Sequence, residues 1–151
     1  MIRTATPEDF LPLVLLEREC FPLAERWSGS AWGEEVARDG HLALVHTGLE
    51  GVDAAAAFRV SDDFGDVLRV LVAPAARRRG IAAQLLEIGL TWAWEQGAER
   101  IMLEVRHDNS AAVELYRKYG FEALTVRRDY YGPDADALVM IRTFAAEEPD
   151  E

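Results

Sequence analysis

The sequence predicts an α/β (α+β mixed) domain in which one mixed central β-sheet carries helices on both faces. Three observations support this prediction. The chain has 151 residues, which suits one domain of common size. Apolar runs of strand length alternate with segments of helical periodicity, and no repeat or low-complexity linker divides the chain. We expect the domain to occupy residues 1–144 and residues 145–151 to form an acidic, frayed tail.

The N-terminal half contains three expected strands and two expected helices. Thr6 caps the first helix and Pro7 suits its first turn, as is typical of a helix start. A turn that contains Gly48 and Gly51 separates the second strand from the third. The expected elements are a strand at 2–5, a helix at 6–20, a loop at 21–30, a short helix at 31–38, and strands at 41–47 and 52–60.

The C-terminal half is expected to alternate strands with helices. Apolar residues recur with helical period from Ile81 to Trp92, and this helix ends before Gly97. The expected elements are strands at 66–72 and 100–105 joined by a helix at 80–96, a helix at 109–119 closed by Gly120, and strands at 121–127 and 138–143. The helical crossover predicts that the first two of these strands lie parallel. Ligands of such sheets bind at the carboxyl ends of the strands.

Composition and charge argue against several classes of function. The net charge of −11, from 16 basic and 27 acidic residues, disfavours a nucleic-acid surface. Acids such as Asp62, Asp63 and Asp66 either attract a basic protein tail or simply solubilise the surface. No segment approaches the roughly 20 apolar residues that span a bilayer, and the N-terminus lacks the apolar centre of a signal peptide, so we expect a cytoplasmic protein without a membrane partner. Cys20, the single cysteine, is expected as a small buried side chain, and the three histidines lack ligand spacing, so we expect no metal.

A basic turn follows the strand at 66–72 and opens the next helix. It reads Arg77-Arg78-Arg79-Gly80-Ile81-Ala82. The unpaired N–H groups of a helix start, the positive end of the helix dipole and the arginines all favour an anion, and Gly80 lets the backbone approach it. The turn is therefore a candidate pyrophosphate site. A solvated basic turn that caps the helix explains the same residues.

Three polar side chains near the end of the strand at 100–105 are candidates for chemistry. Glu104 interrupts an apolar run and is a candidate general base. Asn109 and Tyr116 lie about two helical turns apart and therefore share a helix face. Each residue also has an ordinary structural explanation. Glu104 would pair with Arg69 or Arg106, Asn109 would be an N-cap, and Tyr116 would be a half-buried aromatic residue.

Taken jointly, four motifs resemble the GNAT superfamily of N-acetyltransferases, and within it the ribosomal-protein-alanine N-acetyltransferases. The motifs are Arg77-x-x-Gly80-x-Ala82, Leu103-Glu104-Val105-Arg106, the helix at 109–121, and Arg128-Asp129-Tyr130-Tyr131 followed by Asp136-Ala137-x-x-Met140. The resemblance is close over residues 66–143. It is looser in the N-terminal half, where it rests on Ile2-Arg3-x-Ala5-x-x-x-Asp9 and Phe21-Pro22. It implies a GNAT-type fold and acetyl-CoA as the co-substrate.

The resemblance also implies a role for each matching residue. Glu104 matches the family's proton acceptor and Tyr116 its proton donor, while a backbone N–H near Leu71 would stabilise the oxyanion. The residues implied to contact acetyl-CoA are Val70, Leu71, Val72, Arg77, Arg78, Arg79, Gly80, Ile81, Ala82, Ala83, Asn109 and Tyr116. Those implied to border the acceptor are Arg69, Trp27, Tyr130 and Tyr131. The implied acceptor is the N-terminal amine, of alanine, of a small-subunit ribosomal protein.

Two features depart from the family's pattern. Arg69 stands where the family commonly has a small polar residue, on the strand expected beside Glu104. It is expected to suppress Glu104 as a base, to bind another acid such as Asp66, or to orient a substrate carbonyl. Residues 23–26 look like an insertion into the family's Phe-Pro-Trp-Ser, which bears on recognition by Trp27.

Two other functions stay open at this point. One is a GNAT acetyltransferase that acts on lysine or on a small-molecule amine. The other is a non-catalytic acetyl-CoA-binding module that docks on another protein, with Trp27 and Trp32 as a candidate surface, although tryptophans packed against the domain explain the same residues.

Overall fold

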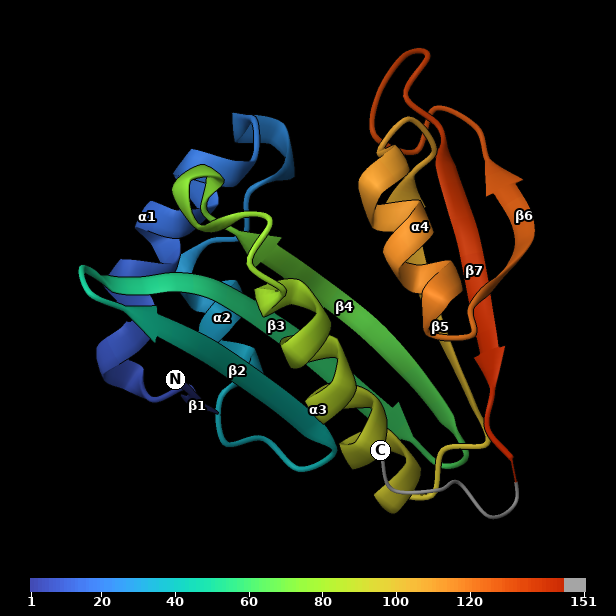
Figure 1. Ribbon diagram of the computed structural model, residues 1–151, viewed down its shortest axis with the longest axis horizontal. Coiled ribbons are helices and arrows are strands. Elements are labelled where there is room, and N and C mark those ends of the chain that lie inside the picture. The colour runs from blue at the N-terminus through green and yellow to red at the C-terminus, as the bar shows by residue number, and fades with distance from the viewer. Residues whose placement is uncertain (146–151) are drawn as a thin grey trace.

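The computed structural model describes residues 1–145, which form one seven-stranded sheet with the strand order β1-β2-β3-β4-β5-β7-β6 (Figure 1). The strands are β1 (Ile2–Thr4), β2 (His41–Gly48), β3 (Gly51–Ser61), β4 (Phe64–Val72), β5 (Arg100–Arg106), β6 (Glu122–Arg127) and β7 (Ala137–Thr143). The α-helices are α1 (Phe10–Cys20), α2 (Gly29–Glu35), α3 (Ile81–Glu95) and α4 (Ser110–Lys118), and short 3₁₀ turns are η1 (Pro7–Asp9), η2 (Leu23–Glu25) and η3 (Pro74–Ala76). The predicted fold class is confirmed. The predicted tail lies outside the described residues, apart from Ala145.

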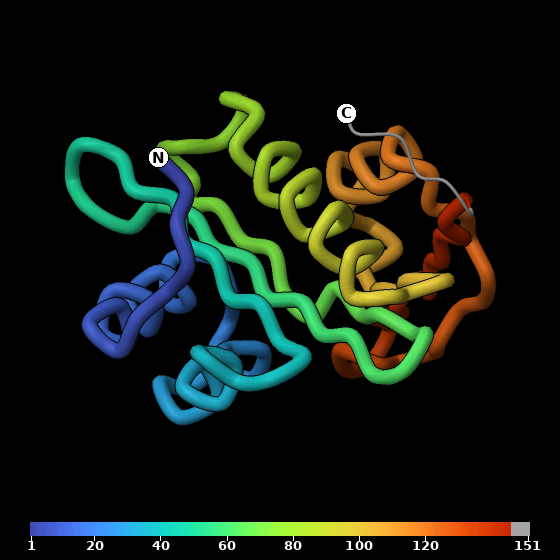
Figure 2. Tube along the Cα trace, turned by 90° about the horizontal axis from the view of Figure 1, so that it is seen from below, coloured from blue at the N-terminus to red at the C-terminus, as the bar shows by residue number. Residues whose placement is uncertain are grey.

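Helices cover both faces of the sheet. Figure 2 shows α3 and α4 on one face and α1 and α2 on the other. The centre of the core uses small side chains, because residues 54–57 of β3 are all alanine and all fully buried, as is the adjacent Phe58. A Cβ built on Gly89 of α3 would lie 2.0 Å from Cζ of Phe58. Only glycine at position 89 therefore lets α3 lie this close to β3.

Most boundaries agree with the sequence to within two residues. The exceptions are the start of the first helix, where residues 7–9 form η1 and α1 begins only at Phe10, and the end of α2, which lies at Glu35 because Val36 is extended. Two of the smaller differences have identifiable reasons. The short helix α2 begins earlier than the predicted 31–38, because the hydroxyl of Ser28 accepts a hydrogen bond from the Ala31 N–H at 3.1 Å and caps the helix there. Strand β4 also begins earlier than predicted, at Phe64, because Asp62 adopts φ 56° and closes a tight β3–β4 hairpin. Neither difference moves a candidate site residue.

Strands β4 and β5 lie parallel, as predicted, but they pair only at their amino ends. The paired residues are Phe64 with Arg100, Gly65 with Ile101, and Asp66 with Met102. A bulge follows in β4, since Phe58 of β3 pairs with Val67 and Ala57 pairs with Arg69, leaving Leu68 as an extra residue. Beyond the bulge the two strands separate, and Figure 1 shows the sheet opening between β4 and β5. The carboxyl half of β4 therefore has one free edge.

Candidate functional site

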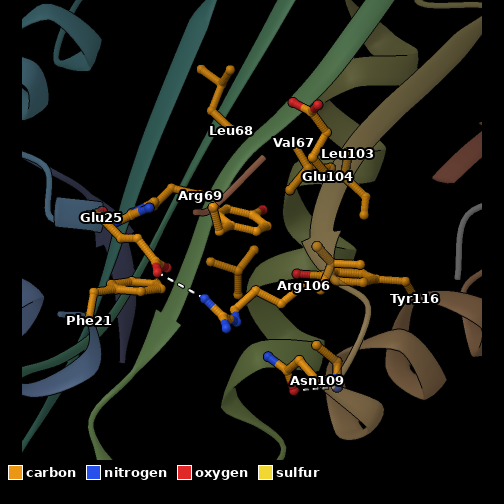
Figure 3. Close-up of a pocket in the computed structure, with 14 residues that line it drawn as sticks. Phe21, Glu25, Val67, Leu68, Arg69, Leu103, Glu104, Arg106, Asn109 and Tyr116 are labelled. Carbon is orange, nitrogen blue, oxygen red and sulfur yellow. Dashed lines mark hydrogen bonds and ion pairs between the residues drawn. The ribbon is translucent and has the colours of Figure 1, made fainter. Parts of the chain in front are cut away.

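A continuous passage runs through the opening between β4 and β5. Its middle is a cavity of about 150 Å³, here called the central hollow, which contains Glu104 and Tyr116 (Figure 3). Toward the start of α4 it joins a groove of about 620 Å³, the helical groove, through shared lining residues such as Val70 and Tyr116. Toward the β6–β7 loop it joins a cavity of about 340 Å³, the tyrosine hollow, through shared residues such as Arg69 and Glu104. A ligand can therefore reach Glu104 from either end.

The free edge of β4 lines the helical groove with main-chain polar groups. The Ala73 N–H donates to the Asp53 carbonyl of β3 at 2.8 Å. Because alternate residues of a strand face opposite neighbours, Leu71 also turns its main chain toward β3, whereas Val70 and Val72 turn theirs toward the opening. The main-chain donors that face the opening beside Leu71 are therefore the N–H groups of Val70 and Val72. Such an edge is suited to pairing with the amides of an extended ligand.

The Val72 carbonyl is already engaged at this edge. The Nε of Arg77 donates to it at 2.9 Å, and the thiol of Cys20 donates at 3.4 Å. Burial raises the pKa of the Cys20 thiol, so it stays protonated and able to donate. Cys20 is thus half-buried rather than buried as predicted, because its thiol reaches the edge of β4 at the helical groove.

The amino end of α3 lies at the mouth of the helical groove, which Arg77 and Ala82 line. Gly80 is the N-cap and adopts φ 78°, a left-handed conformation that favours glycine. The first hydrogen bond of the helix runs from the Gln84 N–H to the Gly80 carbonyl at 3.1 Å, which leaves the preceding N–H groups, those of residues 81–83, for a ligand. Arg78 and Arg79 beside it are exposed. An anion at this helix start would gain both hydrogen bonds and a favourable dipole.

Glu104 lies on β5 and reaches a partner that the sequence did not suggest. Its Oε2 accepts a hydrogen bond from Nη1 of Arg127 at 2.5 Å, and neither Arg69 nor Arg106, the expected partners, bonds to it. The Glu104 side chain is 25% exposed and lines both the central and the tyrosine hollows. Arg127 also lies 4.5 Å from the ring centroid of Tyr130. The carboxylate is therefore paired at the surface yet open to a ligand in the passage.

Tyr116 and Asn109 share one side of the passage, as their spacing predicted. Figure 3 shows Glu104 at one end of the stick view, Asn109 at the other, and Tyr116 between them. Tyr116 is buried against Phe121, with 5.9 Å between ring centroids. Burial raises the pKa of Tyr116 well above its usual range, so the hydroxyl keeps its proton. Asn109 is the N-cap of α4, with Oδ1 accepting from the Ala112 N–H at 3.3 Å.

Arg69 belongs to a buried ion pair that sequence reasoning missed. Its guanidinium donates to both carboxylate oxygens of Glu17 and to the Glu25 carbonyl, the latter at 2.7 Å, and lies 3.9 Å from the ring centroid of Phe21. The two residues first suggested as partners are excluded, because Asp66 binds Arg59 at 2.7 Å and Glu104 binds Arg127. Arg69 still lines the passage, but its charge is used within the protein.

Glu17 is the centre of this network. It is fully buried on α1 and also accepts hydrogen bonds from the Trp27 N–H at 3.0 Å and from Nε1 of Trp32 at 2.9 Å. A signal was present in the sequence, since Glu17 lies four residues after Leu13 and so falls on the buried face of the helix. The network also rules out Trp32 as part of a docking surface, because Trp32 is fully buried. The Trp27 ring packs against it, with 4.9 Å between the ring centroids.

The two tyrosines of the β6–β7 loop, Tyr130 and Tyr131, lie at the end of the passage away from the helical groove. Their ring centroids are 5.0 Å apart, and both line the tyrosine hollow. Burial and the neighbouring charge of Glu104 raise the pKa of Tyr131 to about 12. Within residues 1–145, no helix is long and apolar enough to cross a membrane, and no three His, Cys, Asp or Glu side chains gather as metal ligands.

Comparisons with known proteins agree with this arrangement. The model of the acetyltransferase (GNAT) family matches residues 9–121. An uncharacterized protein of Mycobacterium leprae is 33% identical over 150 residues, which cover 94% of this chain but only 40% of that protein. The [ribosomal protein bS18]-alanine N-acetyltransferase of Salmonella typhimurium is 34% identical over 124 residues, or 80% of each chain. The crystal structure of the ribosomal-protein-S18-alanine N-acetyltransferase of Escherichia coli superposes with a TM-score of 0.84 at 27% identity, covering 99% of this chain and 97% of the other.

Proposed function

We propose that this chain, which belongs to the acetyltransferase (GNAT) family and is an acetyl-CoA-dependent N-acetyltransferase, acts on the α-amino group of a protein N-terminus. The proposed acceptor is an alanine-starting small-subunit ribosomal protein, and the proposed location is the cytoplasm. The names of the Salmonella and Escherichia relatives support this choice of acceptor. At 34% and 27% identity, those names leave the acceptor of this chain to be tested.

One observation carries the proposal: the passage opens on both sides of the sheet, with Tyr116 toward the helical groove and Glu104 toward the tyrosine hollow. An acetyl transfer needs a donor and an acceptor that meet end to end, with a base near the amine and an acid near the leaving thiolate. A passage with one titratable group toward each end suits that requirement. The half-buried Tyr131 and exposed Tyr130 border the acceptor end.

The helical groove fits acetyl-CoA, which supplies an activated thioester when bound. The main-chain groups of Val70 and Val72 would pair with the pantetheine amides, and Asn109 lines the same groove. The first turn of α3, including residues Ile81 to Ala83, would hold the pyrophosphate together with Gly80 and the arginines. Arg77 would have to release the Val72 carbonyl as the pantetheine amides take its place.

The chemistry then assigns one role to each group. A protein α-amine has a pKa of about 7.7–8.0, so Glu104 can take its proton, directly or through one water. The neutral amine attacks the thioester carbonyl, which forms the C–N bond, while the Val70 N–H stabilises the oxyanion. The C–S bond breaks as Tyr116 gives its proton to the departing thiolate, and the new amide nitrogen gives up its extra proton to solvent. Solvent then restores the proton of Tyr116 and takes the proton held by Glu104. No acyl-enzyme is required.

A panel of acceptors tests the proposal. The purified protein is incubated with acetyl-CoA and peptides that have free or blocked N-termini, including an alanine-starting ribosomal-protein peptide and lysine peptides, together with polyamines. Mass spectrometry locates the added acetyl group. Acetyl on the α-amine of the alanine peptide, and none on its blocked form, supports the proposal. Acetyl on lysine or a polyamine contradicts it in favour of the second acceptor class, and acetyl-CoA binding without transfer favours the non-catalytic module.

A further inference from the structure

The segment at 23–26, which looks like an insertion, places a second carboxylate beside the passage. It folds into η2, and the Glu25 N–H donates to the Pro22 carbonyl at 2.9 Å. The Glu25 carbonyl accepts from Nη2 of Arg69 at 2.7 Å, and Arg69 is itself held by the buried Glu17. Both main-chain groups of Glu25 are therefore fixed, which directs its side chain toward β5.

The Glu25 carboxylate meets Arg106 across the opening of the sheet. Oε2 of Glu25 accepts from Nη1 of Arg106 at 2.9 Å, and Figure 3 shows this contact as a dashed line between the two residues. The Glu25 side chain is only 13% exposed and that of Arg106 is 37% exposed. The pair joins the loop next to β4 to the end of β5, two segments that share no strand pairing at this level.

The location of the pair within the passage is specific. Glu25 and Arg106 line both the helical groove and the central hollow, and neither lines the tyrosine hollow. They therefore bridge the two walls at the junction between the groove and the hollow. Any ligand that extends from the helical groove toward Glu104 must lie alongside this ion pair.

We propose that Glu25 and Arg106 act as a positioning pair, here called the clasp, which holds the loop at 21–28 against β5 and retains the pantetheine arm in the passage. The part that concerns the pantetheine arm rests on the proposed function. In the clasp, a charged hydrogen bond of 2.9 Å is shielded from water on the Glu25 side, so it holds better than a fully exposed pair. Opening of the clasp then limits how fast the arm leaves.

Four variants test the clasp. Glu25→Ala and Arg106→Gln each break it, and the double charge swap Glu25→Arg/Arg106→Glu restores the attraction with the charges reversed. Asp108→Asn is the matched control, because it removes only the weaker contact that Arg106 makes at 3.4 Å with an exposed carboxylate. Stopped-flow measures the dissociation rate of coenzyme A, and hydrogen exchange in the ligand-free protein measures the protection of amides at 21–28.

The expected results separate the clasp from the proposed function. Each single variant should release coenzyme A about three- to fivefold faster, raise the KM for acetyl-CoA more than it lowers kcat, and speed amide exchange at 21–28. The charge swap should recover most of each change, and Asp108→Asn should match the wild type. The clasp is overturned if both single variants release coenzyme A and exchange the amides at 21–28 at the wild-type rates. It is also overturned if the charge swap recovers neither rate. If the wild type binds no coenzyme A, the proposed function fails, and the exchange data alone decide whether the pair holds the loop.

Discussion

The passage has two walls, one formed by β4 and one formed by β5, and the ion pair on the first is buried while the ion pair on the second is exposed. On the β4 wall, the Arg69 charge is paired with Glu17, which is fully buried and accepts hydrogen bonds from two further groups. On the β5 wall, Glu104 is paired with Arg127, but its side chain is 25% and that of Arg127 is 55% exposed. A buried, fully bonded carboxylate is committed to the fold. A carboxylate paired at the surface can exchange its partner for a substrate at small cost.

This difference predicts which carboxylate serves catalysis and which serves stability. The proposed transfer requires a base that an amine can approach, and Glu104 lines a cavity while Glu17 is fully buried. The fold requires the loop at 21–28 to be anchored, and Glu17 does this through Arg69 and the Trp27 N–H. Substitutions at the two positions should therefore affect different measurements.

The largest expected effect follows Glu104→Gln. The amide keeps the shape of the side chain but accepts no proton, so kcat/KM for the accepted peptide should fall about 10²- to 10⁴-fold. Steady-state kinetics by release of free coenzyme A thiol measures this, and calorimetry should show unchanged binding of coenzyme A. Turnover within a factor of two of the wild type would remove Glu104 as the base.

The next effect is on folding rather than turnover. Glu17→Gln leaves the Arg69 charge buried without a counter-charge, which should lower the free energy of unfolding by about 3–5 kcal/mol. Urea denaturation measures it. The control is Glu17→Gln/Arg69→Met, which removes both charges while keeping an acceptor for the tryptophan N–H groups, and it should cost less than the single change. A single variant as stable as the wild type would contradict the buried role, and activity per folded molecule should fall far less than in Glu104→Gln.

A third substitution tests how closely α3 packs on β3, the strand that pairs with β4. Gly89→Ala places a methyl group where the Phe58 ring lies 2.0 Å away, and overpacking of this kind costs about 1–3 kcal/mol. Urea denaturation again measures the loss. Adding Phe58→Leu should make the Gly89→Ala step less costly, because the smaller side chain frees space. An unchanged unfolding midpoint would mean that α3 shifts freely on β3.

The sequence predicted most of the scaffold but only part of the site. The elements, the helix that ends before Gly97 and the parallel pairing of β4 with β5 followed from local patterns, and the N-cap Asn109 was identifiable from its own residue type. The partner of Arg69 could not be identified from the sequence, because Glu17 lies 52 positions away and on a helix. Ion pairs between distant elements depend on how those elements pack.

The same limit explains why the sequence did not predict the main-chain donor in β4 or the contact between Glu25 and Arg106. The choice between Leu71 and Val70 depends on the register of β4 with β3 and on a bulge at Leu68, which no residue pattern announces. Glu25 could be recognised only as part of an insertion, since its contact with Arg106 spans 81 positions. Local rules therefore locate candidate residues, and tertiary geometry decides which of them face a ligand.

The smallest expected effect is on the titration of the tyrosines, which responds to the charge of Glu104 on the β5 wall. The pKa values of all four tyrosines are raised, that of Tyr131 to about 12, and the charge of Glu104 contributes at Tyr130 and Tyr131. Tyrosinate absorbance should therefore appear at higher pH in the native protein than in urea. A raised pKa in the folded state stabilises the fold below about pH 10, and this contribution is lost as the pH rises through the native values.

Titrating the Glu104→Gln and Glu17→Gln variants shows which of the two carboxylates contributes to the tyrosine pKa values. Removing the Glu104 charge takes away the repulsion that disfavours a tyrosinate nearby, so part of the native absorbance change should move to lower pH by a fraction of a unit. Glu17→Gln should move the curve less, because Glu17 itself is not among the charges that act on the tyrosines and its partner Arg69, which lowers the pKa of Tyr131, is still present. Equal shifts in both variants would mean that Glu17 acts on the tyrosines as strongly as Glu104 does, and would contradict the contrast between the two walls.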